Sequence, residues 1–210
     1  MFLYLYIAIL ICVVLFAVIL KSRNMQLWIM SYIREKLYVR STSDKSIKNI
    51  YVSLVDHYEP YFKNASQEEA RSIVLTWVTK YREAASMHTD SNGNHPQHTY
   101  FYPEEEYDEW VLDQISGICK GGLGDLDIHL HHDNDTAENL QSTLLKFKKL
   151  LHDKHGLLRK NAEGEIVYGF IHGNWALDNS RPDGKWCGVN NEIEVLLNTG
   201  CVFDMTLPSA

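Results

Sequence analysis

The chain is poor in positive charge, and it contains no internal repeat and no low-complexity tract. Lysine and arginine total 20 against 27 aspartates and glutamates, which gives a formal net charge of −7. No basic surface can dominate such a chain, so a nucleic-acid-binding role is not expected. Hydrophobic residues make up 45% and charged residues 22%, proportions that indicate a folded protein rather than a disordered one.

Cysteine is also scarce, and its spacing is unsuited to disulfides or to a cysteine-rich metal site. Cys12 lies in the apolar N-terminus, which leaves Cys119, Cys187 and Cys201 as an odd set without CxxC spacing. A disulfide framework is therefore not expected. We expect these cysteines to be small, buried hydrophobic residues.

One long hydrophobic run stands at the N-terminus. Phe2 to Leu20 carry no charge, and as a helix they would span about 28 Å, close to the thickness of a bilayer's hydrocarbon core. A cleaved signal peptide would need a basic start and a small-residue cleavage site, and neither is present. The sequence predicts a transmembrane anchor over residues 1–22 and a basic juxtamembrane segment over residues 23–48.

From residue 49 onward, short apolar runs alternate with amphipathic stretches. Strands are expected at 50–55, 99–102, 126–131, 166–171 and from 201, with helices between them. This alternation predicts an α/β domain of parallel βαβ units. A doubly wound sheet would have a glycine-rich loop after its first strand, whereas here the strand ends in Asp56-His57. We therefore favour a partial (β/α) barrel, and we expect residues 49–210 to lack its C-terminal strands.

The densest group of polar residues follows the third predicted strand. Alternate residues of a strand share one face, so Asp127, His129 and His131 are expected to point the same way. Asp135 follows in the next turn. Two imidazoles on one face, followed by carboxylates, predict a site for a divalent cation such as zinc.

Three other strand ends carry candidate residues. Asp56 and His57 end the first strand, where a barrel would hold its active site. His172 and Trp175 follow the fourth strand, and they could serve as a proton donor and a sugar-stacking platform. Asp204 ends the fifth.

Taken in chain order, these sites resemble the motifs of the NodB-type polysaccharide deacetylase superfamily, which includes carbohydrate esterase family 4. The resemblance covers about residues 50–210 and lies in residues 52–59, 99–101, 127–135, 170–175 and 203–204. Three positions depart from the family pattern. His57 stands in place of a second aspartate, Asp135 in place of a second histidine, and Ile171 in place of an arginine.

The resemblance implies a metal-dependent hydrolase that deacetylates a cell-surface polysaccharide or its precursor. A divalent metal, with zinc the first candidate, would be held by His57, His131 and Asp135, with His129 nearby. The metal would polarise the acetyl carbonyl and lower the pKa of a bound water.

The same resemblance assigns roles in proton transfer and substrate binding. Asp56 would take the proton of the water, and His172 would protonate the leaving group. Trp175 and Asp204 would contact the acetylated sugar. A membrane anchor suits a polymer modified at the membrane, but the side of the membrane stays open. Basic residues only after the hydrophobic run favour a cytoplasmic domain, whereas the family resemblance favours the outside.

Two alternatives remain. The pattern Asp127-x-His129-x-His131 is similar to the HxH signature of PHP-type phosphoesterases and amidohydrolases, although that signature follows the first strand of those domains and here follows the third. The second alternative is a catalytically degenerate relative that binds glycan or acts as a scaffold in polysaccharide biosynthesis. The altered acidic pair and the missing arginine favour it.

Overall fold

The computed structural model describes residues 2–38 and 49–207, and the chain divides into two compact units, Met1–Tyr51 and Val52–Ala210. The first unit contains α1 (Phe2–Ser22), a 3₁₀ turn (Met25–Leu27) and α2 (Ile29–Tyr38). Within the described residues, α1 is the one helix long and apolar enough to cross a membrane, a property that signal sequences share. Residues 39–48 of the predicted juxtamembrane segment lie outside the described part.

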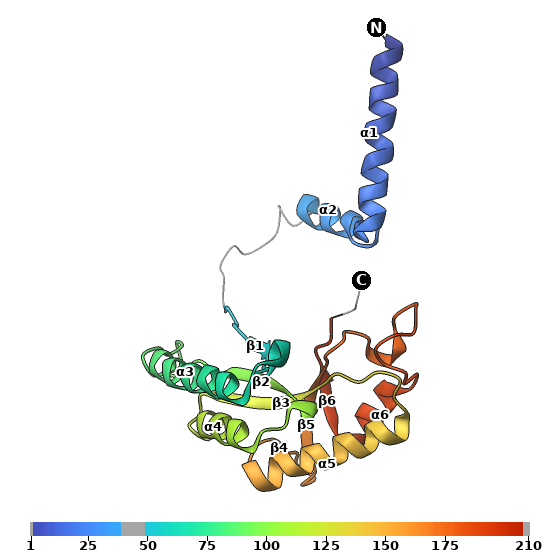
Figure 1. The fold of residues 1–210 in the computed structure, drawn as a ribbon. Helices are drawn as coiled ribbons and strands as arrows, with labels where there is room; N and C mark the ends of the chain where they lie inside the picture. The colour runs from blue at the N-terminus through green and yellow to red at the C-terminus, as the bar shows by residue number, and fades with distance from the viewer. Residues whose placement is uncertain (1, 39–48, 208–210) are drawn as a thin grey trace. The chain divides into compact units, whose positions relative to one another are not determined.

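The second unit is built on a mainly parallel sheet (Figure 1). Its parallel strands are neighbours in chain order, namely β1 (Leu54–His57), β2 (His98–Pro103), β3 (Gly124–Leu130), β5 (Ile166–His172) and β6 (Cys201–Asp204). The short strand β4 (Arg159–Lys160) pairs antiparallel with β5, and the apolar pattern did not predict it. The α/β class and the parallel sheet are confirmed.

Four helices connect the strands: α3 (Gln67–Ser86), α4 (Glu109–Lys120), α5 (Ala137–His155) and α6 (Glu192–Thr199). Sequence signals explain several of their ends. Ser66 and Glu69 form a capping box at the start of α3. Helix α4 begins at Glu109, because residues 104–106 form a separate 3₁₀ turn and Asp108 is the N-cap.

One face of the sheet is covered by all four helices, and consecutive helices contact one another. Alternate residues of the central strands supply the strand side of this core: Tyr100, Tyr102, Leu126, Ile128, Leu130, Tyr168 and Phe170. The helices pack against them with residues such as Val74, Ile115, Leu144 and Leu196. The residues between them in the strands point to the opposite face, and these include His129.

Asp108 links α3 to the start of α4, and its charge should stabilise the fold. Its carboxylate accepts hydrogen bonds from the Trp110 and Val111 amides and pairs with Arg71 at 3.2 Å. Burial opposes ionisation, but hydrogen bonds from Tyr61, Val111 and Arg71 hold the pKa of Asp108 below its ordinary value.

We expect Asp108→Asn, which keeps an N-cap side chain but removes the charge, to cost on the order of 1 kcal/mol at pH 7. The ordinary pKa of an aspartate is 3.8, and the pKa of Asp108 in the folded protein is lower. The ionised carboxylate therefore stabilises the wild type above pH 3.8, and this stabilisation is lost as the pH falls through the lowered pKa of Asp108. Urea unfolding at pH 7 and in acid checks this. A cost independent of pH would contradict it.

Candidate metal centre

The register of the strands divides the predicted site residues between the two faces of the sheet. Asp56 lies beside Tyr100, and His172 lies beside Leu130, so both point to the helix-covered face. His57 is one residue further along β1 than Asp56 and therefore points to the opposite face. His129, one residue before Leu130, points there as well. The sheet thus brings His57 and His129 together and turns Asp56 and His172 away from them.

On this opposite face, three donors gather at the carboxyl ends of β1 and β3. The Oε1 atom of Glu59 lies 3.1 Å from Nε2 of His129 and 3.4 Å from Nδ1 of His57. All three donor atoms lie within 4.8 Å of one another. His129 is fully buried, and the side chain of Glu59 is 15% exposed. We call these three residues the open-face group.

The contacts of His129 limit the protonation state of its Nε2 atom, which faces the carboxylate of Glu59. In a neutral ring Nε2 presents a lone pair to this carboxylate, and only a positively charged ring presents a proton. Its Nδ1 atom lies 3.1 Å from the carbonyl oxygen of Ile171, which can only accept, so Nδ1 carries a proton. Burial lowers the pKa of His129, which disfavours a second proton. Hydrogen bonds from His129 and His57 hold the pKa of Glu59 far below its ordinary range. A neutral His129 would therefore point a lone pair at an ionised carboxylate, which is repulsive. A cation bound between the two would turn both contacts into favourable ones.

The spacing of the donors fits such a cation. Two ligands of a tetrahedral zinc ion, each about 2.0–2.1 Å from the metal, lie roughly 3.4 Å apart. The two distances from Glu59, 3.1 and 3.4 Å, are close to this value. The other ring nitrogen of His129 donates to a backbone carbonyl, as ligating histidines usually do. The open-face group therefore fits a divalent metal with two imidazoles and one carboxylate.

His131 and Glu105 lie beside this group. Nδ1 of His131 is 2.5 Å from Oε1 of Glu105, and its Nε2 is 3.3 Å from Nε2 of His129. Gly173 packs so closely on this ring that an added Cβ would lie 2.3 Å from it. The His131 side chain is 33% exposed. It can therefore reach both the open-face group and solvent.

The hydrogen bond that the His131 ring donates to the carboxylate of Glu105 raises the pKa of His131 above its ordinary value. We therefore expect Glu105→Gln to lower the pKa of His131, as measured by NMR titration of its ring. Glu104→Gln, in the same acidic run, is the matched control and should leave the His131 titration nearly unchanged. An unchanged pKa in Glu105→Gln would contradict this coupling.

The structure places three predicted residues on or near the helix-covered face. Asp56, whose side chain is 44% exposed, accepts a hydrogen bond at 2.9 Å from His98, a buried ring that packs against Tyr100. Asp135 lies beside His132, with 3.3 Å between Oδ2 and Nδ1, and not in the open-face group. His172 is fully buried and lies next to His132, with ring centroids 4.5 Å apart.

Trp175 lies in the loop that follows β5, and Asp204 is the last residue of β6. Trp175 is 51% exposed and has a left-handed backbone (φ 55°), which is unusual for a bulky residue. Asp204 accepts hydrogen bonds from the amide and hydroxyl of Thr206, and that hydroxyl accepts from the amide of His172. Asp204 therefore shapes the turn after β6, while Trp175 offers an exposed ring.

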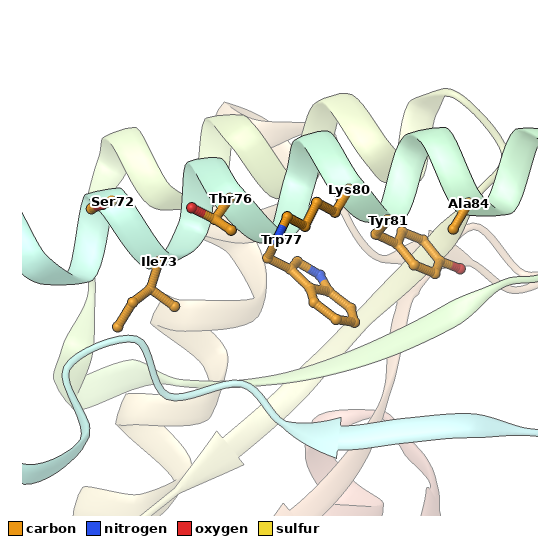
Figure 2. Close-up of a pocket in the computed structure, with 7 residues that line it drawn as sticks. All are labelled: Ser72, Ile73, Thr76, Trp77, Lys80, Tyr81 and Ala84. Atoms are coloured by element: carbon orange, nitrogen blue, oxygen red, sulfur yellow. The ribbon is translucent and has the colours of Figure 1, made fainter.

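A separate apolar cavity of about 520 Å³ lies along α3 (Figure 2). Trp77 and Tyr81 stack on its wall, with ring centroids 5.3 Å apart. Its lining contains no carboxylate and no imidazole; it consists of Ser72, Ile73, Thr76, Trp77, Lys80, Tyr81 and Ala84. This cavity therefore offers no ligands for a divalent metal.

Sequence reasoning missed Glu59 and Glu105 as members of the site. A signal for Glu59 was present, because it lies two residues after His57 and so continues the same face of the strand. Glu105 is the second residue after β2, in the 3₁₀ turn of residues 104–106. Comparisons with models of protein families, with curated proteins and with solved structures found no match.

Proposed function

We propose that this chain is a divalent-metal-dependent hydrolase that removes acetyl groups from a polysaccharide, on a partial (β/α) barrel of the deacetylase type. The observation that carries the proposal is the convergence of His57, Glu59 and His129 on one point at the carboxyl ends of β1 and β3. Such strand ends form the active sites of (β/α) barrels.

The barrel form is supported by the strand order. The five parallel strands follow one another in chain order without the reversal that defines a doubly wound sheet. The helices cover one face of the sheet, as they cover the outside of a barrel. In this arrangement the open-face group would point to the barrel interior at its upper rim.

His57, Glu59 and His129 would hold the ion, and zinc suits two imidazoles and one carboxylate that leave a fourth position free. A divalent ion bound there would polarise the acetyl carbonyl and lower the pKa of a water molecule, so that the water loses a proton more readily as it attacks the carbonyl. His131 is oriented by Glu105 and presents Nε2 toward the same point. It would take the proton of the attacking water and pass it to the leaving nitrogen or oxygen as that bond breaks.

The assignment of proton transfer to His131 replaces Asp56 and His172 in that role. Both of those residues face the helix-covered side of the sheet, away from the open-face group. His131 was expected to be a metal ligand, and its position beside the group supports either role. The exposed ring of Trp175 would stack on the sugar, and α1 would anchor the enzyme beside its polymer.

The proposal is tested by measuring acetate release from acetylated oligosaccharides by the full chain in detergent. Elemental analysis should find a divalent ion, and a chelator should abolish acetate release until zinc is restored. A phosphate monoester assayed in parallel tests the phosphoesterase alternative. A folded protein without a divalent ion at the open-face group would overturn the proposal and would favour glycan binding without turnover.

A further inference from the structure

A second group of donors lies on the helix-covered face, and it shares no residue with the open-face group. It consists of His132 after β3, His172 at the end of β5, Cys187 in the following loop and Glu192 in the first turn of α6. One donor atom from each lies within 4.8 Å of the others. His172, Cys187 and Glu192 are buried, and the His132 side chain is 11% exposed. We call these four residues the closed group.

The distances centre on the carboxylate of Glu192. Its Oε1 atom lies 3.0 Å from Nε2 of His132 and 3.9 Å from Nε2 of His172, and its Oε2 atom lies 3.3 Å from Sγ of Cys187. These values bracket the separation of roughly 3.4 Å between neighbouring ligands of a tetrahedral ion. Two imidazoles, one thiol and one carboxylate make four donors, the number that a closed structural zinc site uses.

Two observations show that the closed group is incompletely satisfied by its own hydrogen bonds. First, Nε2 of His172 is buried and has no hydrogen-bond partner, which is destabilising for a polar atom. Second, Nδ1 of His132 is buried and makes no hydrogen bond, although a carboxylate lies close to it. Nδ1 of His132 also lies 3.3 Å from the carboxylate of Asp135. With Nε2 bound to a metal, Nδ1 would donate its proton to Asp135, as ligating histidines do to carboxylates.

The closed group joins segments that are far apart in the chain, and one of its members, Cys187, lies in the loop of residues 173–191. Four residues of this loop that are not glycine have left-handed backbones: Trp175, Asp178, Asn179 and Trp186. Such conformations persist only where the surroundings enforce them. The loop is also held near the closed group, because the amide of Asp135 donates to the carbonyl of Cys187. An ion there would fasten this strained loop, with its exposed tryptophans, to β3 and α6.

We propose that His132, Cys187, Glu192 and His172 form a second metal site, which binds zinc in a structural role and holds the loop of residues 173–191 in place. Burial raises the pKa of the Cys187 thiol to about 11, so zinc binding would release its proton. The backbone amide of Asn174 donates to Nδ1 of His172. The proton of the neutral His172 ring is therefore on Nε2. His172 can bind an ion through Nε2 only after this proton leaves Nε2. His132, Cys187 and Glu192 are therefore the three ligands that bind without such a change in His172.

Cobalt(II) titration of the full chain, purified in detergent and freed of metal, tests this site. Within the described residues, the closed group has a sulfur donor and the open-face group has none. Bound cobalt should therefore produce a thiolate-to-cobalt charge-transfer absorption. Cys187→Ser should abolish this absorption and remove one equivalent of zinc in elemental analysis. Cys201→Ser, which alters a cysteine outside the closed group, is the matched control and should retain both.

The wild-type spectrum decides the proposal even if Cys187→Ser fails to fold. A folded wild-type protein that binds cobalt without the sulfur band would overturn the site, as would a band that persists in folded Cys187→Ser. Glu192→Gln keeps the thiol and should weaken cobalt binding at least 10-fold; unchanged affinity would exclude Glu192. Because the open-face group gives no sulfur band, failure of this site and failure of the proposed function are distinguishable.

Discussion

Replacement of His129 by alanine is expected to abolish metal binding at the open-face group and to reduce acetate release to background. His129 is fully buried and directs Nε2 at the carboxylate of Glu59 from 3.1 Å. Loss of the hydrogen-bond partner of a ligand typically lowers metal affinity by about 10–100-fold. The loss of His129 removes one of the three ligands itself, so metal affinity should fall by more than about 100-fold. Elemental analysis and the acetate assay measure both effects.

Two further variants make this result specific. Glu59→Gln conserves the shape of the side chain and should lose the metal as His129→Ala does. His88→Ala removes an exposed histidine after α3 and should change neither quantity. If His129→Ala retained full metal and activity, the open-face group would not be the site.

His131→Ala separates the two roles that its position allows. As the proton acceptor, His131 should be dispensable for metal binding, while turnover should fall by about 10²–10⁴-fold. Loss of the metal together with turnover would instead make His131 a ligand, as the sequence resemblance implied.

The second large effect is expected at Ile128, the residue before His129 in β3, whose side chain points to the other face of the sheet. Ile128 is fully buried in the core between β2 and β5, and Ile128→Ala should lower the free energy of unfolding by about 2–5 kcal/mol. Urea denaturation measures the change. Ile193→Ala, at a 55% exposed position in α6, should stay within about 0.5 kcal/mol of wild type. Equal effects of the two variants would contradict the assignment of Ile128 to the core.

Much of the fold could be predicted because periodicity reports burial directly. The runs around Tyr100, Ile128 and Phe170 are apolar because those strands pack under helices, and the capping box at Ser66 marks a helix start within four residues. β4 was not predicted, since two exposed residues, Arg159 and Lys160, carry no apolar signal. The first strand begins later than expected, at Leu54, because apolar residues before it are exposed.

The site was harder to predict because proximity across strands depends on register. The sequence indicated His57 and His129 but grouped them with Asp135, which the turn after β3 places beside His132 instead. Adjacent residues of a strand point to opposite faces, so Asp56 could have been separated from His57 on this ground alone. Cys187 and Glu192 gave no local signal. Their meeting with His132 depends on the path of a long loop.

The alternation of faces along β3 also limits how this protein can change in length. His131 and His132 are consecutive, yet one lies beside the open-face group and the other in the closed group. Inserting or deleting a single residue in β3 would turn every later side chain to the other face, so both groups would lose their histidines at once. Tolerated insertions should therefore fall in exposed turns such as residues 90–94 and 161–164, and the length of β3 should be fixed among descendants that keep both groups.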